Sequence, residues 1–461
     1  MRYFYVILFV VLSSCSAAKK ELVDENSIIF SDKESAYLLY DLEKNTLIDS
    51  HNIDKALTPA SLFKIVTAYA ALEILGSEYK FETKILYNGK LKDGVLYGDL
   101  IIQGLGDPSL NYQDLYNIAQ LIKLNGIKEV KGNLLYNDNY FINLKAINDK
   151  QPASIYNPGL SSLLIKESNF AVEFNDNRKL FTVPKLDYLS FKLSYKYQVP
   201  EYKKRGKWFL SKQKHYLPAK DTSRFFMEIL AQNMAQEKIK IRKISKSSDL
   251  TNAKKIFSYT GDSFLDIIRD NLQYSENIVS EILLLHTARK LSCKVISLAD
   301  AANCIKVWYS KKYNNLEWLN LDWSNGSGLS SDTKIAASHL LEILKSLSMQ
   351  QYKNNFGASL FAVSGVEGTL TRKFREYPLN IWGKTGTMYY ISATAGYLYD
   401  KGNKYVFVIM ANNSNARKEI DDLQLDRNKY EEYQDKISEA GEWKNLALEY
   451  QEELISKWLD N

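Results

Sequence analysis

Histidine is scarce in this chain, which has only four in 461 residues. None of them has an Asp, a Cys or a second His at a spacing typical of a catalytic triad or a metal site. We therefore expect no metal and no cofactor, and we look first for a nucleophile that an amine activates. The four residues are His51, His215, His286 and His339.

Cysteine is also rare, with three in the chain. Cys293 and Cys304 lie eleven residues apart in a stretch with a helical pattern. The pair is as consistent with two buried thiols as with a disulfide in an oxidising compartment. The third cysteine, Cys15, belongs to the N-terminal segment.

Strong net charge and long apolar runs are absent as well. A net charge of +6 is too small to indicate binding to nucleic acid. The apolar run Tyr3–Leu12 is too short to span a bilayer as a stable helix, and together with Arg2 it is typical of a targeting segment. We therefore expect an exported, periplasmic protein.

The N-terminal segment ends on Leu12-Ser13-Ser14-Cys15, which resembles a bacterial lipobox. The resemblance implies that Cys15 is acylated, becomes the mature N-terminus and holds the protein on a membrane by its lipid. Ser16, at the second mature position, favours the outer membrane. The alternative is ordinary signal cleavage after Ala17 or Ala18.

The predicted fold is α+β, with an antiparallel sheet that draws on both ends of the chain. Ala36–Asp41 and Thr46–Ser50 flank a short turn and predict a hairpin. Ile391–Tyr399 and Tyr405–Ala411 predict a second one. We expect both hairpins, and the strand that carries Lys384, to share one sheet.

Helices with apolar residues at helical spacing should pack around this sheet. At 461 residues the chain is too long for one ordinary domain. The predicted helices are Leu62–Leu75, Phe264–Leu291 and Ser338–Ser348. The predicted domains are a signal peptide (1–14), a main domain split into 15–82 and 259–416, a large inserted α/β region of two lobes (83–258) and a helical tail (417–461).

Within the inserted region, short β-like segments alternate with helical ones. The predicted elements are strands Ile85–Tyr87, Gly98–Gln103 and Gly132–Tyr136 and helices Tyr112–Leu124 and Thr222–Gln236. The basic and aromatic segment Lys203–Phe209 is typical of a solvated hairpin, with contact to anionic wall or membrane components as the alternative.

The tail carries apolar residues along one helical face, which must be covered by something. The two interpretations are docking onto this protein's own surface and contact with a partner or a membrane. The face consists of Trp443, Ala447, Tyr450, Leu454 and Trp458.

The tetrapeptide Ser61-Leu62-Phe63-Lys64 begins a predicted helix and offers a nucleophile that needs no histidine. Residues three apart share a helix face, so the Lys64 amine should lie beside the Ser61 hydroxyl. Thr58 is a good N-cap and Pro59 fits the first helical position. In the first turn the Ser61 N–H has no helical partner and is able to hold an oxyanion.

Two later motifs complete a pattern. Ser275-Glu276-Asn277 opens an apolar helical stretch, and Lys384-Thr385-Gly386-Thr387 stands between β-like segments. Their order, S-x-x-K, then S-x-N, then K-T-G, resembles the active-site serine set of penicillin-binding proteins and β-lactamases. Each motif alone is weak, but three in this order are specific.

The resemblance narrows to the D-alanyl-D-alanine carboxypeptidase/endopeptidase family, the low-molecular-mass class C penicillin-binding proteins. The long interval between Ser61 and Ser275 fits the domains that this family inserts there, whereas β-lactamases have a shorter one. Asn325 departs from the Asp usual in the family. The matching segments are Gly98–Leu110, Val130–Leu134, Asn325–Ser330 and Ser364–Leu370.

The resemblance implies a penicillin-binding-protein/β-lactamase-like transpeptidase domain that hydrolyses peptidoglycan stem peptides and is acylated by β-lactam antibiotics. In this interpretation Ser61 attacks a D-Ala-D-Ala-type bond and Lys64, once neutral, is the base. Ser275 relays a proton, and Asn277 holds Lys64 or the substrate amide. Helix capping is the alternative for Ser275 and Asn277.

The K-T-G segment should bind the other end of the substrate. Lys384 and Thr385 would bind its terminal carboxylate, and Gly386 would let its backbone approach the strand. By resemblance, the N–H of Thr387 completes the oxyanion hole with that of Ser61.

Two other functions stay open at this point. A β-lactamase of the same fold would need a water-activating group, and Glu317–Asn320 is one residue short of the corresponding class A element. A catalytically silent cell-wall scaffold is the other alternative. The sequence does not divide carboxypeptidase from endopeptidase activity, because both reactions form the same acyl-enzyme.

Overall fold

The computed structural model describes residues 34–152, 154–174, 180–186, 202–204, 207–209, 215–424 and 429–460. Of these, residues 34–63, 331–350 and 361–460 form one compact unit, and 64–330 with 351–360 form the other. Each unit has a sheet and an apolar core of its own. Cys15 lies outside the described residues.

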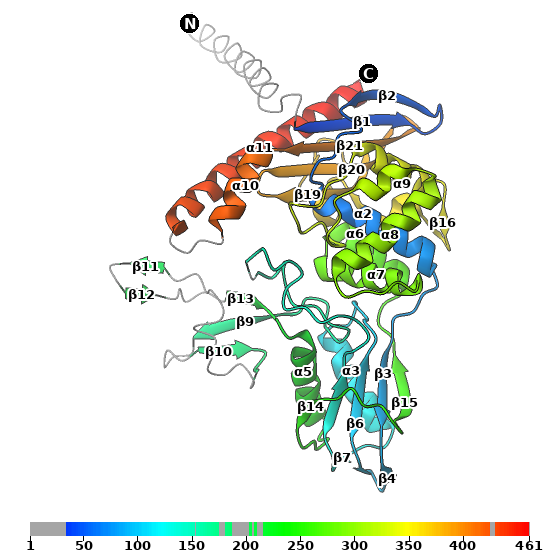
Figure 1. Cartoon of the computed structure of the whole chain (residues 1–461), viewed down its shortest axis with the longest axis vertical. Coiled ribbons are helices and arrows are strands. Elements are labelled where there is room, and N and C mark those ends of the chain that lie inside the picture. Colours follow the sequence, from blue (N-terminus) through cyan, green and yellow to red (C-terminus); the bar gives the residue numbers. More distant parts are fainter. Residues whose placement is uncertain are drawn as a thin grey trace, which may run out of the picture. The chain divides into compact units, whose positions relative to one another are not determined.

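The first unit is built on a six-stranded sheet in the order β18-β19-β20-β21-β1-β2, in which all neighbours are antiparallel (Figure 1). Both predicted hairpins and the sheet that they share are confirmed. The strands are β1 (Ser35–Asp41), β2 (Thr46–His51), β18 (Ala362–Val363), β19 (Ile381–Met388), β20 (Ile391–Asp400) and β21 (Asn403–Asn412).

Helices cover both faces of this sheet, which explains why β20 and β21 are buried over most of their length. The Tyr397 hydroxyl donates to the carbonyl of Leu344 in α9 (Ala337–Ser348) at 2.8 Å. The Thr394 hydroxyl donates to Gln451 in α11 (Tyr430–Asp460) at 2.6 Å. Because Thr394 and Tyr397 are three apart on one strand, they face opposite sides of the sheet.

The C-terminal tail docks on this sheet. It forms α10 (Ser414–Leu423) and α11, and Leu454, Ile455 and Trp458 of α11 pack in one core with Leu39 and Phe407 (Figure 1). Of the two interpretations of the tail, the described contacts show docking on the protein's own surface. Among the described residues no helix is long and apolar enough to cross a bilayer.

The second unit contains a five-stranded sheet, β14-β8-β6-β3-β15, with α3 and α5 packed against it (Figure 1). All of its strands and both helices fall within residues 83–259, so the inserted region has its own core. Its elements are β3 (Thr83–Tyr87), β6 (Leu100–Gly104), β8 (Leu134–Asn137), β14 (Ile244–Lys246), β15 (Lys254–Tyr259), α3 (Tyr112–Leu124) and α5 (Thr222–Gln236). The predicted strands and helices of this region are confirmed.

Smaller sheets and short helical turns complete the two units. The remaining strands are β4 (Lys90–Lys92), β5 (Val95–Tyr97), β7 (Glu129–Val130), β9 (Asn169–Phe174), β10 (Leu180–Val183), β11 (Tyr202–Lys204), β12 (Lys207–Phe209), β13 (His215–Pro218), β16 (Gln351–Tyr352) and β17 (Asn355–Phe356). The 3₁₀ turns are η1 (Ala60–Leu62), η3 (Leu316–Asn320), η4 (Gly357–Leu360) and η5 (Gly368–Leu370).

The single helix predicted over Phe264–Leu291 is wrong. The structure has α6 (Phe264–Tyr274) and α7 (Asn277–Lys290), separated at Ser275, whose φ of 69° is left-handed and ends α6. The apolar pattern continues through the break, and for that reason periodicity alone did not reveal it. Helix α8 (Leu298–Tyr313) follows, and a disulfide joins Cys293 to Cys304, with the Cα atoms 6.4 Å apart.

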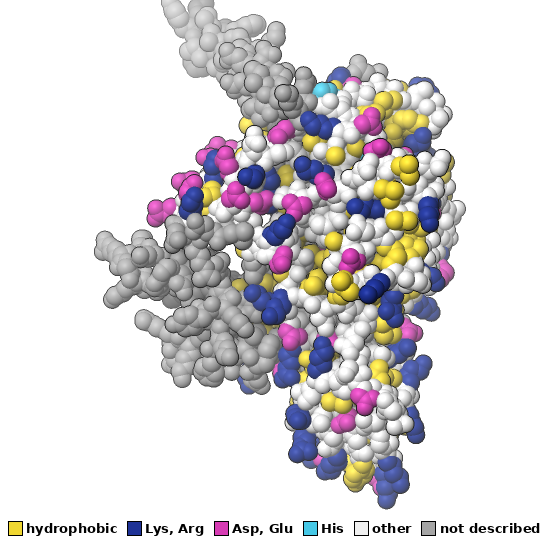
Figure 2. All heavy atoms as spheres, in the orientation of Figure 1, with side chains coloured by type: hydrophobic (Ala, Val, Ile, Leu, Met, Phe, Trp, Pro, Cys, Tyr) yellow, Lys and Arg dark blue, Asp and Glu magenta, His cyan; other side chains and the backbone are white. Residues whose placement is uncertain are grey.

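Lys and Arg side chains gather over one end of the inserted region (Figure 2). The exposed cations there come from β4, from the ends of β7 and from the chain that leads into β14. They are Lys90, Lys92, Lys128, Lys131, Lys240, Arg242 and Lys243.

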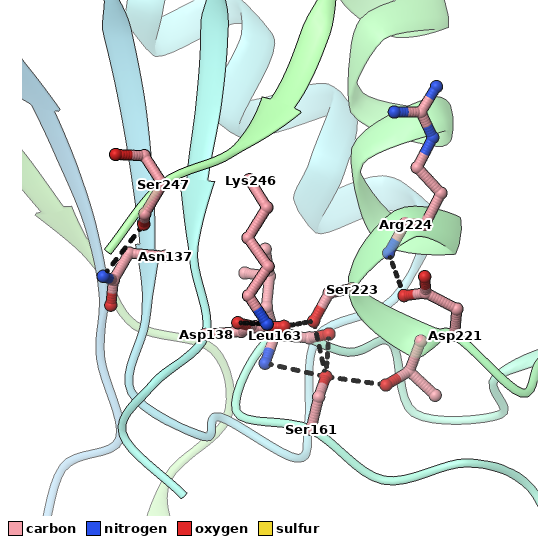
Figure 3. Close-up of polar contacts among 10 residues, drawn as sticks. Asn137, Asp138, Ser161, Leu163, Asp221, Ser223, Arg224, Lys246 and Ser247 are labelled. Atoms are coloured by element: carbon pink, nitrogen blue, oxygen red, sulfur yellow. Dashed lines mark hydrogen bonds and ion pairs between the residues drawn. The ribbon is translucent and has the colours of Figure 1, made fainter. Parts of the chain in front are cut away.

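A buried polar cluster joins the end of β8 to the start of α5 (Figure 3). Asp138, which is 3% exposed, accepts a hydrogen bond from the Ser223 hydroxyl at 2.7 Å and lies 2.6 Å from Lys246 Nζ. The Ser223 hydroxyl is also 2.8 Å from that of Ser161, which is 2.7 Å from that of Thr222. The buried carboxylate thus has both a cation and a donor as partners, as a buried charge requires.

We expect Asp138→Ala to lower the free energy of unfolding by about 2–4 kcal/mol, because it leaves buried donors and a cation without their acceptor. Urea denaturation followed by circular dichroism measures the change. The matched control is Asp149→Ala, in an exposed part of the same region, which should change stability by no more than about 0.5 kcal/mol. Equal values for the two variants would contradict the structural role of the cluster.

Candidate active site

The candidate nucleophile, Ser61, lies in η1, directly before α2 (Phe63–Leu75). The residue before it, Ala60, has a φ of 48°, a left-handed conformation that costs a non-glycine residue about 1–2 kcal/mol. The predicted N-cap is wrong: Pro59 occupies the capping position, and the Thr58 hydroxyl donates to the carbonyl of Ser331 at 3.2 Å. Contacts outside the helix therefore hold this turn.

Strand β19 leaves one edge open along the K-T-G segment. β18 pairs with β19 only at Trp382 and Gly383, and no other described strand covers that edge. The N–H of Ser364 donates to the carbonyl of Ile381 there, at 2.9 Å. Because successive residues of a strand turn their peptide groups to alternate sides, the N–H of Thr387 points to the same open edge.

Gly386 lies against the Ser61 turn. A β-carbon at Gly386 would stand 2.3 Å from the carbonyl oxygen of Pro59 and 3.3 Å from the Ser61 nitrogen. We expected glycine here because substrate must approach the strand, but the structure shows that the protein's own turn occupies that space. The two N–H groups predicted for an oxyanion hole thus come from segments that pack on each other in one unit.

Lys384 and Thr385 are both buried in β19. The Lys384 ammonium donates to the carbonyl of Thr385 at 2.9 Å. Thr385 and Thr387 share the face of β19 opposite Lys384 and Gly386, since side chains alternate along a strand. Thr387 is exposed.

Lys64 belongs to the second unit, since the boundary falls after Phe63. Its side chain is fully buried, which is exceptional for a lysine. The ammonium donates to Asn277 Oδ1 at 2.7 Å and to the carbonyl of Ser327 at 3.0 Å. The structure therefore brings together two of the predicted catalytic residues and one carbonyl that the sequence did not single out.

Burial is the main electrostatic influence on this amine. It lowers the pKa of Lys64 to about 7, while the negative charges of Glu281 and Glu276 act in the opposite direction. At neutral pH a substantial fraction of Lys64 is therefore neutral and able to accept a proton.

Ser275 is placed by the break between α6 and α7. Its N–H donates to the carbonyl of Asn271 at 3.0 Å, and its side chain is half-buried. It does not cap α7, whose capping position is Glu276. Asn277 does not cap the helix either, because its amide nitrogen donates to the carbonyl of Tyr156 at 2.7 Å.

Glu281 was missed by sequence reasoning, although it is completely buried one helical turn after Asn277. Its carboxylate accepts the N–H groups of Gly326 at 2.6 Å and Ser327 at 2.9 Å. The available signal was a lone Glu in the apolar segment Ile278–Leu285, which a buried helix tolerates only when the charge has partners.

Asn325, where the family usually has Asp, shapes the neighbouring loop. Its Oδ1 accepts the N–H of Gly328 at 3.0 Å, and its carbonyl accepts Trp323 Nε1 at 2.9 Å. The side-chain oxygen of Asn accepts the Gly328 N–H as the oxygen of an Asp would. The replacement of Asp by Asn therefore keeps this contact in the loop.

Among the described residues, no group of His, Cys, Asp or Glu side chains could hold a metal ion. The Lys64 amine donates to an amide oxygen and a backbone carbonyl and lies in the field of two carboxylates, and this set suits a buried amine. The chemistry that it supports is proton transfer at the Lys64 amine.

The protein is similar to two D-alanyl-D-alanine carboxypeptidases. It is 22% identical over 448 residues to the D-alanyl-D-alanine carboxypeptidase DacB of Haemophilus influenzae, covering 86% of this chain and 90% of that protein. It is 29% identical over 134 residues to the D-alanyl-D-alanine carboxypeptidase of Actinomadura sp. strain R39, covering 28% of this chain and 25% of that protein.

Solved structures share the fold. The crystal structure of penicillin-binding protein 4 from Haemophilus influenzae matches with a TM-score of 0.68 and 20% identity, over 85% of this chain and 93% of that one. A penicillin G-acylated predatory endopeptidase from Bdellovibrio bacteriovorus, in complex with an immunity protein, matches with a TM-score of 0.52 and 14% identity, over 92% of both chains.

The family model for D-Ala-D-Ala carboxypeptidase 3 (S13) matches residues 21–198 and 210–429, which is most of the chain. The fold, the order of the three motifs and this match agree, and the chain belongs to the S13 family of D-Ala-D-Ala carboxypeptidases.

Proposed function

We propose that this protein hydrolyses D-Ala-D-Ala-type bonds in peptidoglycan stem peptides through an acyl-enzyme on Ser61. The observation that carries the proposal is the buried Lys64 amine, held by Asn277 and the carbonyl of Ser327 three residues after the candidate nucleophile. An amine with its pKa near 7 in that place is suited to general-base catalysis.

The reaction has two halves. Neutral Lys64 takes the proton of the Ser61 hydroxyl while the oxygen attacks the peptide carbonyl, and the N–H groups of Ser61 and Thr387 stabilise the oxyanion. The C–N bond then breaks, and Ser275 relays the proton from Lys64 to the leaving amine, which leaves Lys64 neutral again. Water attacks the ester, Lys64 takes a proton from the water, and the acid product leaves as Ser61 regains its proton.

Asn277 keeps the Lys64 amine in place, since its Oδ1 accepts a hydrogen bond from it at 2.7 Å. Lys384 and Thr385 bind the carboxylate at the end of the substrate. A carboxypeptidase and an endopeptidase differ in whether the leaving amine belongs to free D-Ala or to a cross-linked stem peptide. Digestion of purified peptidoglycan, followed by identification of the products, separates the two activities.

The β-lactamase alternative gains no support from Glu317. This residue is exposed in η3, where its carboxylate accepts the side-chain N–H of Asn320 at 3.2 Å. A fluorescent penicillin decides the matter: a stable label indicates a penicillin-binding protein, rapid turnover indicates a β-lactamase, and no label indicates a silent scaffold.

We expect Ser61→Ala to abolish covalent labelling by penicillin, because the acyl group would have no oxygen to join. Mass spectrometry of the labelled wild-type protein should place the adduct on the peptide that contains Ser61. Unchanged circular dichroism is the control for folding. An adduct on Ser275 or Ser327 would overturn the assignment of the nucleophile.

The rate of acylation should rise with pH and level off above about pH 7, because only neutral Lys64 is a base and its pKa is about 7. Stopped-flow measurement of penicillin acylation between pH 5 and 9 follows the change. Lys64→Arg keeps the charge but does not release a proton, so it should lose about 10²-fold or more in rate at the plateau above pH 7. A rate independent of pH in the wild type would contradict the role of Lys64 as the base.

Lys384→Ala should weaken recognition of the substrate carboxylate more than it weakens the chemical step. The matched substrates are one acyl-D-Ala-D-Ala peptide with a free C-terminus and the same peptide as its amide. We expect the variant to lose about 10-fold or more in kcat/KM for the free acid and much less for the amide. Equal losses for both substrates would show that Lys384 does not act on the carboxylate.

We also propose that Cys15 carries a lipid, on the strength of Leu12-Ser13-Ser14-Cys15. Each buried methylene contributes about 0.8 kcal/mol, so two or three chains hold a protein firmly on a membrane. Cys15→Ala should move the protein from the membrane to the soluble fraction while penicillin labelling persists. A soluble wild-type protein whose N-terminus is an unmodified Lys19 would rule out the anchor.

A further inference from the structure

The Lys64 contacts have a second layer, which starts at Glu281. Glu281 lies on α7 four residues after Asn277, so both face the same side of the helix. Asn277 touches the amine directly. Glu281 instead accepts the N–H groups of Gly326 and Ser327, and it also accepts the Ser327 hydroxyl.

Those three donors belong to the loop that supplies the second acceptor for Lys64. The carbonyl of Ser327 accepts the Lys64 ammonium at 3.0 Å. The other side of the loop is held by Thr67, one turn along α2 from Lys64, whose hydroxyl donates to the carbonyl of Gly326 at 2.6 Å. A neutral residue and a charged one therefore clamp the same short loop.

A buried carboxylate is a costly way to hold a loop. Moving the charge out of water costs several kcal/mol, which the bonds to donors only partly offset. A neutral side chain could hold a loop at lower cost, as the Thr67 hydroxyl does from α2 by donating to the carbonyl of Gly326. We therefore expect the negative charge of Glu281 to have a function at this site beyond holding the loop.

We propose that Glu281 is a positioning residue of this site, which holds the carbonyl of Ser327 against the Lys64 amine and keeps a negative charge behind that amine. The inference rests on the proposed role of Lys64 as the base. Without the charge the ammonium would lose a proton at lower pH and would be a weaker base. With it, the amine has a pKa of about 7 despite complete burial.

Other charges act on the same group and must stay constant in a test. Glu276, at the junction of α6 and α7, also favours the charged form of Lys64. Burial raises the pKa of Glu276, the charge of Lys166 lowers it and the charge of Asp270 raises it. Lys166 and Asp270 form an ion pair at 2.6 Å. Burial raises the pKa of Glu281 itself, and the donors of Gly326 and Ser327 oppose that shift.

The test compares Glu281→Gln with Thr67→Val. Both variants remove one clamp of the Gly326–Ser327 loop, but only Glu281→Gln removes a charge. The measurement is the rate of penicillin acylation as a function of pH, in the full-length protein, with circular dichroism as the check on folding.

For Glu281→Gln we expect a loss of about 10-fold or more in the plateau rate, from the displaced carbonyl. Because the charge of Glu281 raises the pKa of Lys64, its removal lowers that pKa. The rise of rate with pH should therefore move to lower pH by about one unit. Thr67→Val should lower the plateau rate of acylation without changing the pH at which the rate rises.

A third variant keeps the proposal testable if Glu281→Gln does not fold. Glu281→Asp retains the charge but shortens the reach to the loop, so it should lower the plateau and leave the rise near its wild-type pH. A Glu281→Gln profile with an unmoved rise, or a wild-type plateau for Glu281→Asp, would overturn the proposal. A wild-type protein that penicillin does not acylate would instead overturn the proposed function.

Discussion

The burial of one amine is the constraint on which the rest of this site depends. Lys64 has no access to water, so every one of its interactions must come from the protein. The structure supplies an amide oxygen from Asn277 and a backbone carbonyl from Ser327, with Glu281 behind the carbonyl. These acceptors stabilise the charged form, burial stabilises the neutral form, and the balance leaves the pKa near 7. In the proposed mechanism, a higher pKa would leave less of the amine neutral at pH 7, and a lower pKa would make it a weaker base.

The strand that bears the K-T-G motif, β19, is also stabilised by contacts from other segments. Among the described strands, β19 is unpaired on one edge along the K-T-G segment, and an open strand edge is a liability that proteins normally cover. On one face of this strand, the Ser61 turn contacts Gly386 so closely that no side chain fits. Behind the strand, Gln451 of α11 bonds to Ser392 and Thr394, which pair with Thr387 and Thr385. The tail thereby stabilises the part of the sheet that the motif uses.

Elements with a regular spacing of apolar residues could be predicted from the sequence. Features that depend on tertiary contacts could not. The hairpins around β1 and β20 and the helices α3 and α5 follow from alternation, helical spacing and turn residues, and these were predicted to within a few residues. The break at Ser275 escaped prediction, because a left-handed serine leaves no mark in the apolar spacing of its neighbours. Glu281 escaped for a related reason: its partners are backbone groups of Gly326 and Ser327, and backbone contacts have no sequence signature.

Left-handed backbone occurs in two of the three motif regions, and it explains why contacts far along the chain are needed. Ala60 before the candidate nucleophile and Ser275 in the S-x-N motif both adopt left-handed backbone, at about 1–2 kcal/mol each. Neither conformation is favoured by its own sequence, so each must be imposed from outside. For the turn at Ala60, the imposing contacts are the bonds of Thr58 to Ser331 and Asn412. A conformation held in this way is kept only in the folded protein, where it fixes the backbone of the Ser61 turn in advance, as the proposed nucleophile requires.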